Sequence, residues 1–250
     1  MKISVVTCVL GVLYISATGC TDMAGDDMAA LADEDVVESA EALSVIGTGA
    51  ADNIYGSNAA DEIDARGGND YVQARAGHDS VRGRQGDDYI LGENGNDWLY
   101  GDSDDDYLDG GDGNDYQFGG QGDDWLVGGF GDDSLYGDDS DDDFGYDNLD
   151  GGYGDDYLAG GAGEDTLRGG EGDDWLQGGP DNDTYKIDGL GNDYIFDDQG
   201  EYDLAHYEPG VSCQGLQDGN DCVLSCNTGG TVRFVGHYVN AHTIEDSGCP

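Results

Sequence analysis

A nine-residue period limits this chain to a small number of folds. From Gly47 to Tyr136, ten nonapeptides such as GGQGDDWLV (119–127) follow one another without an insertion. The sixth position of every unit is Asp, and the eighth is apolar or aromatic except at Gln117. Repeats that hold their phase over such a length are typical of solenoids, in which each unit packs on its neighbours. We therefore expect a repeat architecture and not an ordinary globular core.

The period also predicts the local structure of each unit. A fourteen-residue unit, Gly137 to Asp150, interrupts the phase; four nonapeptides restore it, and after Ile187 a last unit brings the series to sixteen. Gly at the first, second and fourth positions permits positive φ and tight turns, while the last three residues alternate out, in, out as a short strand. One side chain per unit would then enter a thin apolar ladder between two parallel sheets: Ile90, Leu99, Leu108, Leu126, Leu135, Leu158, Leu167 and Leu176.

Charge shows that this ladder needs a second stabiliser. The chain carries 56 Asp plus Glu against 8 Lys plus Arg, a net charge of -48, which by itself favours disorder. However, 16 Tyr, 3 Trp and 5 Phe are too many for a solvated acidic tail. Each buried aliphatic contributes about 1.5–3 kcal/mol, whereas each ordered residue costs about 1–2 kcal/mol of backbone entropy. The sign of the charge excludes nucleic acid and anionic membranes as electrostatic partners and leaves cations, basic proteins or neutral ligands.

The repeated Asp indicates which cation this is. Carboxylates and glycine-loop carbonyls are hard oxygen ligands that suit Ca²⁺ better than Mg²⁺. Units such as GGQGDDWLV and GGEGDDWLQ match the pattern GGxGxDxUx at every defined position, and residues 47–205 resemble the RTX, or haemolysin-type, calcium-binding repeats. The resemblance implies an all-β, right-handed parallel β-roll with two nonapeptides per turn. It also implies roughly ten to fourteen Ca²⁺ ions, each between loops of successive turns.

The same resemblance names the ligands. It implies carboxylate ligation by the sixth-position residues Asp70, Asp79, Asp88, Asp97, Asp106, Asp115, Asp124, Asp133, Asp142, Asp156, Asp165, Asp174 and Asp183. It implies carbonyl ligation by loop glycines Gly110, Gly111, Gly113, Gly119, Gly120, Gly122, Gly128, Gly129, Gly131, Gly151, Gly152, Gly154, Gly160, Gly161, Gly163, Gly169, Gly170 and Gly172.

Some units depart from the pattern. In the first four, loop glycines are replaced by Ala50, Ala59, Ala65 and Ala74, and Arg66 and Arg75 stand at the second position, so we expect weak or absent sites there. Asp104, Ser140 and Asp181 replace the fourth-position Gly, and we expect distorted loops around them.

The N-terminal residues predict export. In residues 1–19, Lys2 precedes an apolar run that ends at Ile15, followed by small residues, as in a cleaved signal peptide. A membrane-spanning helix is the alternative, but the run is short for one. The segment also resembles a bacterial lipoprotein signal, although Ala17 stands where Leu is usual. This resemblance implies an acylated Cys20, an extracellular or cell-surface location and membrane contact only through that lipid. Residues 20–46 are acidic and predict a tether.

The C-terminal residues 206–250 predict a small β cap for the open end of the roll. Alternation around residues 227–230 indicates a hairpin. Cys8 lies in the signal and Cys20 carries the implied lipid, which leaves Cys213, Cys222, Cys226 and Cys249 for two disulfides in one of three pairings. Zinc binding is the alternative, but there is no CxxC pair and an exported chain favours oxidation.

Two classes of function remain. Seventh-position rings would line the outer faces, with Tyr71, Tyr89, Tyr107 and Trp125 on one and Trp98 and Tyr116 on the other. They either pack on their neighbours or form a platform for a glycan or another cell-surface ligand. No GxSxG, HExxH or nucleotide-binding loop occurs, and the four histidines, His78, His206, His237 and His242, suggest no catalytic group. We therefore expect a non-enzymatic structural or adhesive surface module that folds with calcium. The alternative is a hydrolase-associated or carbohydrate-binding accessory protein.

Overall fold

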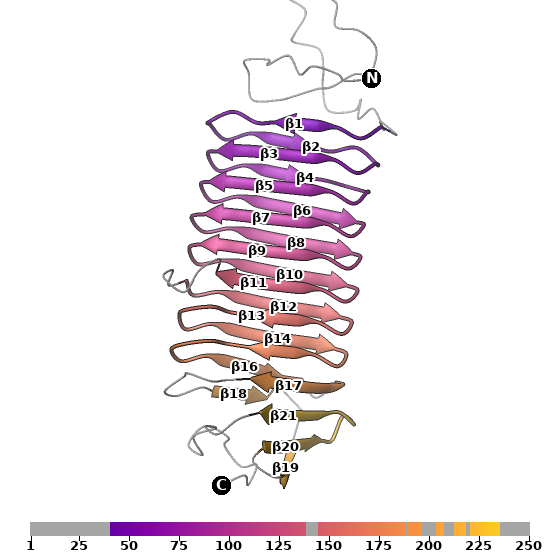
Figure 1. The fold of residues 1–250 in the computed structure, drawn as a ribbon, viewed down its shortest axis with the longest axis vertical. Helices are drawn as coiled ribbons and strands as arrows, with labels where there is room; N and C mark the ends of the chain where they lie inside the picture. Colours follow the sequence, from indigo (N-terminus) through magenta and orange to yellow (C-terminus); the bar gives the residue numbers. More distant parts are fainter. Residues whose placement is uncertain are drawn as a thin grey trace, which may run out of the picture.

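The chain forms a stack of short strands along one axis. The computed structural model of the 250-residue chain describes residues 41–138, 145–188, 190–196, 204–207, 213–218 and 221–235. Two sheets face each other along the stack, with β1 at one end and β19 near the other (Figure 1). All regular structure in these residues is β, so they include no helix that is long and apolar enough to cross a membrane.

Successive strands alternate between the two sheets. Within the described residues, the twelve-stranded sheet has the order β1 (Ser44–Ile46), β3 (Glu62–Gly67), β5 (Ser80–Gln85), β7 (Trp98–Ser103), β9 (Tyr116–Gln121), β11 (Ser134–Asp138), β13 (Tyr157–Ala159), β15 (Trp175–Gln177), β17 (Asn192–Phe196), β21 (Thr231–Val235), β20 (Asp221–Cys226) and β19 (Cys213–Asp218). The nine-stranded sheet has the order β18 (Leu204–Tyr207), β16 (Thr184–Ile187), β14 (Thr166–Glu171), β12 (Asn148–Tyr153), β10 (Trp125–Phe130), β8 (Tyr107–Asp112), β6 (Tyr89–Asn94), β4 (Tyr71–Gln73) and β2 (Asn53–Tyr55).

The register confirms that two nonapeptides make one turn. Tyr107 pairs with Trp125 and Leu108 with Leu126, in parallel and eighteen residues apart. The same offset relates β5 to β7 and β7 to β9 in the other sheet. The result is a parallel β-solenoid of about eight turns, consistent with the expected right-handed roll.

The core is one residue wide, as the period predicts. The strands of the repeats follow the expected out, in, out pattern, as in β7 and β10, and the eighth-position side chain is buried. Ile90, Leu99, Leu108, Leu126, Leu135, Leu158, Leu167 and Leu176 all belong to the single apolar cluster between the sheets. Gln117 is also completely buried and stands between Leu99 and Leu135 in register.

The long unit is accommodated without breaking either sheet. β10 and β12 pair with Trp125 opposite Asn148, an offset of 23 residues in place of 18, so five extra residues (23 − 18) are bypassed. The offset returns to eighteen between β12 and β14. Insertions of this kind are tolerated where the chain leaves the core for the surface.

The C-terminal strands extend the roll, as the cap hypothesis requires. β21 pairs with β17 in parallel, and β20 pairs antiparallel with both β21 and β19. Residues 227–230 connect β20 to β21, which confirms the predicted hairpin. Val232 and Phe234 join the apolar cluster and therefore cover the last turn of the core.

Aromatic rings form columns on both outer faces. Tyr71, Tyr89 and Tyr107 stack along the nine-stranded sheet, with 4.5 Å and an interplanar angle of 6° between the last two rings. Trp98 and Tyr116 stack on the other sheet at 4.8 Å and 12°. Rings stacked in this way cover one another's faces and present mainly their edges to solvent.

Candidate metal centre

The sixth-position carboxylates form two buried ladders along the roll. In each turn the backbone N–H of the Asp donates to Oδ1 of the Asp one turn further on, as from Asp88 to Asp106 (2.7 Å) and from Asp97 to Asp115 (2.8 Å). The same bond recurs from Asp52 at the first turn to Asp193 at the last. Because the donor is backbone and the acceptor is a side chain, each Asp fixes its own loop against the preceding one.

The second oxygen of these carboxylates has no such partner. Oδ2 is buried and accepts no hydrogen bond from the described residues at Asp70, Asp79, Asp88, Asp97, Asp106, Asp115, Asp133, Asp147, Asp156, Asp165 and Asp174. Asp124 and Asp183 are buried at the equivalent position and accept the same backbone bond through Oδ1. A buried carboxylate oxygen without a donor is costly, and a cation is the usual remedy.

Burial raises the pKa values of this set of carboxyl groups. Desolvation raises the pKa of Asp106 and Asp147 to about 9, although the backbone hydrogen bond opposes it and neighbouring carboxylates add to it. The pKa of Asp133 rises to about 8 and that of Asp115 to about 6 for the same leading reason. Near neutral pH the groups with a pKa of about 8 or 9 therefore either retain protons or require a positive ion.

First-position glycines complete the surroundings of each Oδ2. A methyl group added to Gly101 would lie 2.1 Å from Asp106 Oδ2 and 2.6 Å from the carbonyl oxygen of Gly119 in the next turn. The same two kinds of oxygen flank Gly92, Gly128 and Gly151. The predicted reason for glycine was positive φ, but at the first position the reason is this close approach of oxygens.

The second- and fourth-position glycines do have positive φ, as predicted. Gly111 and Gly113 have φ of 100° and 145°, and an added Cβ would collide with carbonyl oxygens of the preceding turn. Asp104 and Asp181 adopt φ of 76° and 82°, so these loops stay in the left-handed region and the distortion expected there is not seen. Ser140 lies outside the described residues.

The oxygens fit calcium better than a metal bound by side chains alone. Within the described residues, no three His, Cys, Asp or Glu side chains gather into a group that could hold a metal ion. An ion beside Asp106 would therefore combine one carboxylate with backbone carbonyls such as that of Gly119. All of these are hard oxygen donors, which match Ca²⁺ with its six to eight oxygens.

The long unit adds a residue to the predicted set. Asp142, assigned by counting six residues from Gly137, lies outside the described residues, and Asp147 has a ladder position in this unit. Asp147 Oδ1 accepts from Asp124 and its own N–H donates to Asp165 (2.8 and 2.9 Å). Counting back from the strand, as Asp-Asn-Leu-Asp, would have found it, because from Asp52 to Asp183 the ladder Asp directly precedes its strand.

All other predicted residues lie in the repeated loops. Every predicted Asp from Asp70 to Asp183 other than Asp142 is buried in a ladder. The first-position glycines Gly110, Gly119, Gly128, Gly151, Gly160 and Gly169 each face the Oδ2 of their own unit. The second- and fourth-position glycines Gly111, Gly113, Gly120, Gly122, Gly129, Gly131, Gly152, Gly154, Gly161, Gly163, Gly170 and Gly172 all have positive φ. The prediction omitted Asp193, which ends one ladder and is buried.

The first turn satisfies its carboxylates without a cation. Thr48 donates its N–H and hydroxyl to Asp52 Oδ2 at 2.6 and 2.8 Å. Ser57 donates its N–H to Asp61 Oδ2 (2.5 Å) and its hydroxyl to Oδ1 (2.9 Å). Both residues stand at the second position, where the next five units have Arg, Glu or Asp and most units from Gly110 onward have Gly. The hydroxyl donors agree with weak or absent sites in the first two units. In the third and fourth units, by contrast, Asp70 and Asp79 have the buried, unpaired Oδ2 of the later units.

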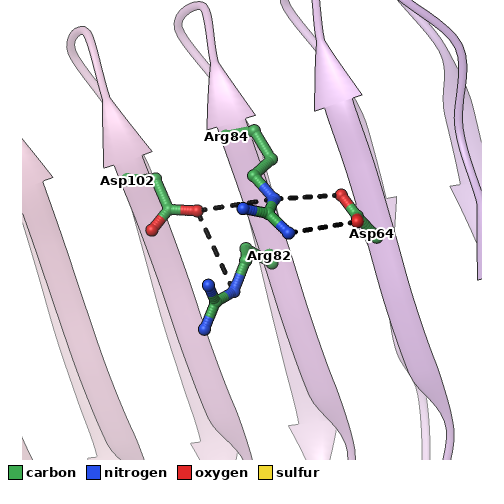
Figure 2. Close-up of polar contacts among 4 residues, drawn as sticks. All are labelled: Asp64, Arg82, Arg84 and Asp102. Atoms are coloured by element: carbon green, nitrogen blue, oxygen red, sulfur yellow. Dashed lines mark hydrogen bonds and ion pairs between the residues drawn. The ribbon is translucent and has the colours of Figure 1, made fainter.

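In the third to fifth units, Arg stands at the second position and makes contacts between turns. Arg66, Arg75 and Arg84 adopt positive φ at the second position, and Arg75 donates to the carbonyl of Gly56 (3.1 Å). Figure 2 shows Arg84 on β5 between Asp64 on β3 (3.1 Å) and Asp102 on β7 (3.8 Å). These ion pairs are partly exposed, so each contributes little to the stability of the fold. Together they connect three neighbouring strands without a metal ion.

Comparison with known proteins agrees with this geometry. Four copies of the RTX calcium-binding nonapeptide repeat match the chain, at residues 46–81, 82–117, 118–148 and 150–185. Together they cover more than half of the 250 residues. No curated protein matches the chain significantly.

The oxygen-lined space beside the first-position glycine can be tested with Gly101→Ala. The added methyl group would collide with Asp106 Oδ2 and the Gly119 carbonyl, so we expect a loss of about 1–3 kcal/mol and a higher calcium concentration at the folding midpoint. Gly67→Ala is the matched control, because its methyl group would meet nothing closer than 3.7 Å and its φ is not positive. If circular dichroism gave equal calcium midpoints for the two variants, the oxygens around Gly101 would not form part of a calcium site.

The raised pKa values predict that, in the presence of a chelator, the stability of the folded roll depends on pH. The pKa of Asp88 rises to about 7 and that of Asp106 to about 9, so the folded roll holds protons that the unfolded chain releases. The stability from these protons is complete below the ordinary Asp pKa and is lost as pH rises through the folded pKa values, about 7 for Asp88 and about 9 for Asp106. Chelated protein should therefore keep more β structure at about pH 5 than at about pH 8. Sedimentation should exclude aggregation, and equal spectra at both pH values would oppose this prediction.

Proposed function

Because the chain belongs to the RTX calcium-binding nonapeptide repeat family, we propose that it is an exported surface module whose roll folds when it binds calcium. The family accounts for calcium binding by a β-roll. Calcium-dependent folding, export and a structural or adhesive role go beyond it and form the proposal. No reaction is assigned to the chain.

The observation that carries the proposal is the row of buried Oδ2 atoms without a donor. Bringing such carboxylates together in a chain of net charge -48 opposes folding. Calcium removes both penalties at once, since it neutralises charge and takes the place of the missing donors. The free chain would stay unfolded at the low calcium concentrations inside a cell and fold at millimolar concentrations outside.

The N-terminal residues support a surface location. The apolar run before Cys20 has the length and flanks of an export signal, and the Cys follows small residues as in lipoproteins. Residues 20–46 would then serve as an acidic tether between the lipid and the first turn of the roll. Such an arrangement would hold the roll away from the membrane. The negative charge of the roll would also be repelled by an anionic membrane surface.

A disulfide in the cap fits the same location. Cys213 and Cys226 lie directly opposite each other in the antiparallel pair β19–β20, where two cysteines are near enough to be bridged. We propose that this pair is oxidised in the exported protein. The bridge would hold together the hairpin that covers the last turn.

The alternative is a carbohydrate-binding or hydrolase-associated accessory protein. The stacked columns do not favour it, because sugars stack on ring faces and these columns present edges. Trp125 is the best candidate within the alternative, since it is tilted by 39° from Tyr107 and is 51% exposed. We therefore propose that the stacked aromatic rings have a structural role and cover the outer faces of the sheets.

Calcium titration tests the proposal directly. At about pH 8, above most of the raised Asp pKa values, purified protein in chelator should lack the β spectrum and gain it cooperatively with calcium. Magnesium at the same concentration is the control and should restore much less, because it demands a stricter geometry. A chelated protein with the same spectrum and melting temperature as the calcium-loaded one would refute calcium-dependent folding.

Surface anchoring is tested with Cys20→Ser. In a bacterial host, the unaltered chain should incorporate labelled palmitate and fractionate with membranes, whereas the variant should do neither. Cys8→Ser, in the apolar part of the signal, is the matched control and should behave like the unaltered chain. Membrane retention of both variants to the same extent would count against a lipid on Cys20.

A further inference from the structure

Gln117 interrupts the apolar column at the centre of the roll. It is fully buried at the eighth position, between Leu99 on β7 and Leu135 on β11. Burying an amide that is not fully hydrogen-bonded costs about 1–3 kcal/mol. A Leu at this position would avoid that cost and would match both neighbours.

The amide of Gln117 reaches the oxygens of one predicted calcium site. A methyl group on Gly110 would lie 2.3 Å from Asp115 Oδ2, 2.8 Å from the Gly128 carbonyl oxygen and 2.8 Å from Gln117 Nε2. The end of the side chain therefore shares one small space with a carboxylate and a carbonyl. The equivalent space beside Gly101 is bounded by Asp106 and Gly119.

The hydrogen bonding of this amide is incomplete. Nε2 donates to the carbonyl of Val127 (2.6 Å), but Oε1 is buried and has no partner among the described residues. The nitrogen and oxygen of an amide can exchange places by a half-turn of the end group. That half-turn gives up the bond to Val127 and places Oε1 beside the Val127 carbonyl oxygen, on the side of Asp115. Oxygens that approach one another in this way need a cation between them, and an amide oxygen is a suitable ligand for calcium.

We propose that Gln117 supplies an amide oxygen to the calcium ion held beside Asp115 and Gly128, so that this site has a side-chain ligand that the neighbouring repeats lack. This inference rests on the proposed calcium binding. It assigns to the polar residue in the core a role that its burial alone does not explain. The site at Asp115 would then bind calcium more tightly than its neighbours with Leu at the eighth position.

A second eighth-position side chain also extends to the carboxylate of its own unit. The hydroxyl oxygen of Tyr185 would lie 2.5 Å from a methyl group on Gly178, which would also be 2.1 Å from Asp183 Oδ2. Here the hydroxyl accepts the N–H of Gly178 (2.8 Å). Polar atoms at the eighth position can thus enter the oxygen-lined space of their own unit.

The test replaces the amide by apolar groups of similar size. Gln117→Leu matches the flanking residues, and Gln117→Met keeps the length of the side chain without its carbonyl. By calorimetric calcium titration of the full chain, both variants should bind one ion about tenfold more weakly than the unaltered chain, or bind one ion fewer. Gln121→Leu, an exposed residue of the same strand, is the control and should leave binding unchanged.

The outcomes separate this inference from the proposed function. If the unaltered chain binds calcium and both Gln117 variants bind the same number of ions equally or more tightly, the role of Gln117 is refuted while calcium binding stands. If the unaltered chain binds no calcium, the proposed function itself fails. Melting temperatures in saturating calcium verify that each variant is folded before its titration is compared.

Discussion

The bond from each Asp backbone N–H to Oδ1 of the next turn sets the conditions for everything else in this structure. It places one carboxylate per unit inside the roll, and it leaves Oδ2 directed at backbone oxygens instead of donors. A single column of aliphatic side chains cannot offset that arrangement together with the cost of ordering the loops. This is the physical basis on which we propose that the roll folds when it binds calcium.

The first turn escapes this dependence, because Thr48 and Ser57 provide the donors that Asp52 and Asp61 need. A second-position side chain is not sufficient by itself, since Asp70 keeps an unpaired Oδ2 although Arg66 stands at the second position of its unit. At the other end, apolar residues of β21 cover the core, but they provide no such donors.

The sequence predicted the repeated features of the fold and missed the local exceptions. The period was sufficient for the strand register, the Leu column and the buried Asp, because each depends only on residue spacing. The ladder position of Asp147 was not predicted, because counting from the loop ignores where an insertion is bypassed; the strand, not the loop, fixes the phase. The reach of Gln117 and the donors of Thr48 could not be predicted, because both require the distance between atoms of different repeat positions.

The geometry of one carboxylate explains why folding along the roll should be cooperative. Asp106 Oδ1 holds the loop of Asp88 in the preceding turn, while its Oδ2 faces the carbonyl of Gly119 in the following one. An ion bound beside Oδ2 would thus fix three successive turns at once. In a solenoid, where stability comes from interfaces between neighbours, each occupied site prepares the loops that form the next. The roll is then expected to assemble over a narrow range of calcium concentration, even though its repeats differ in their ligands.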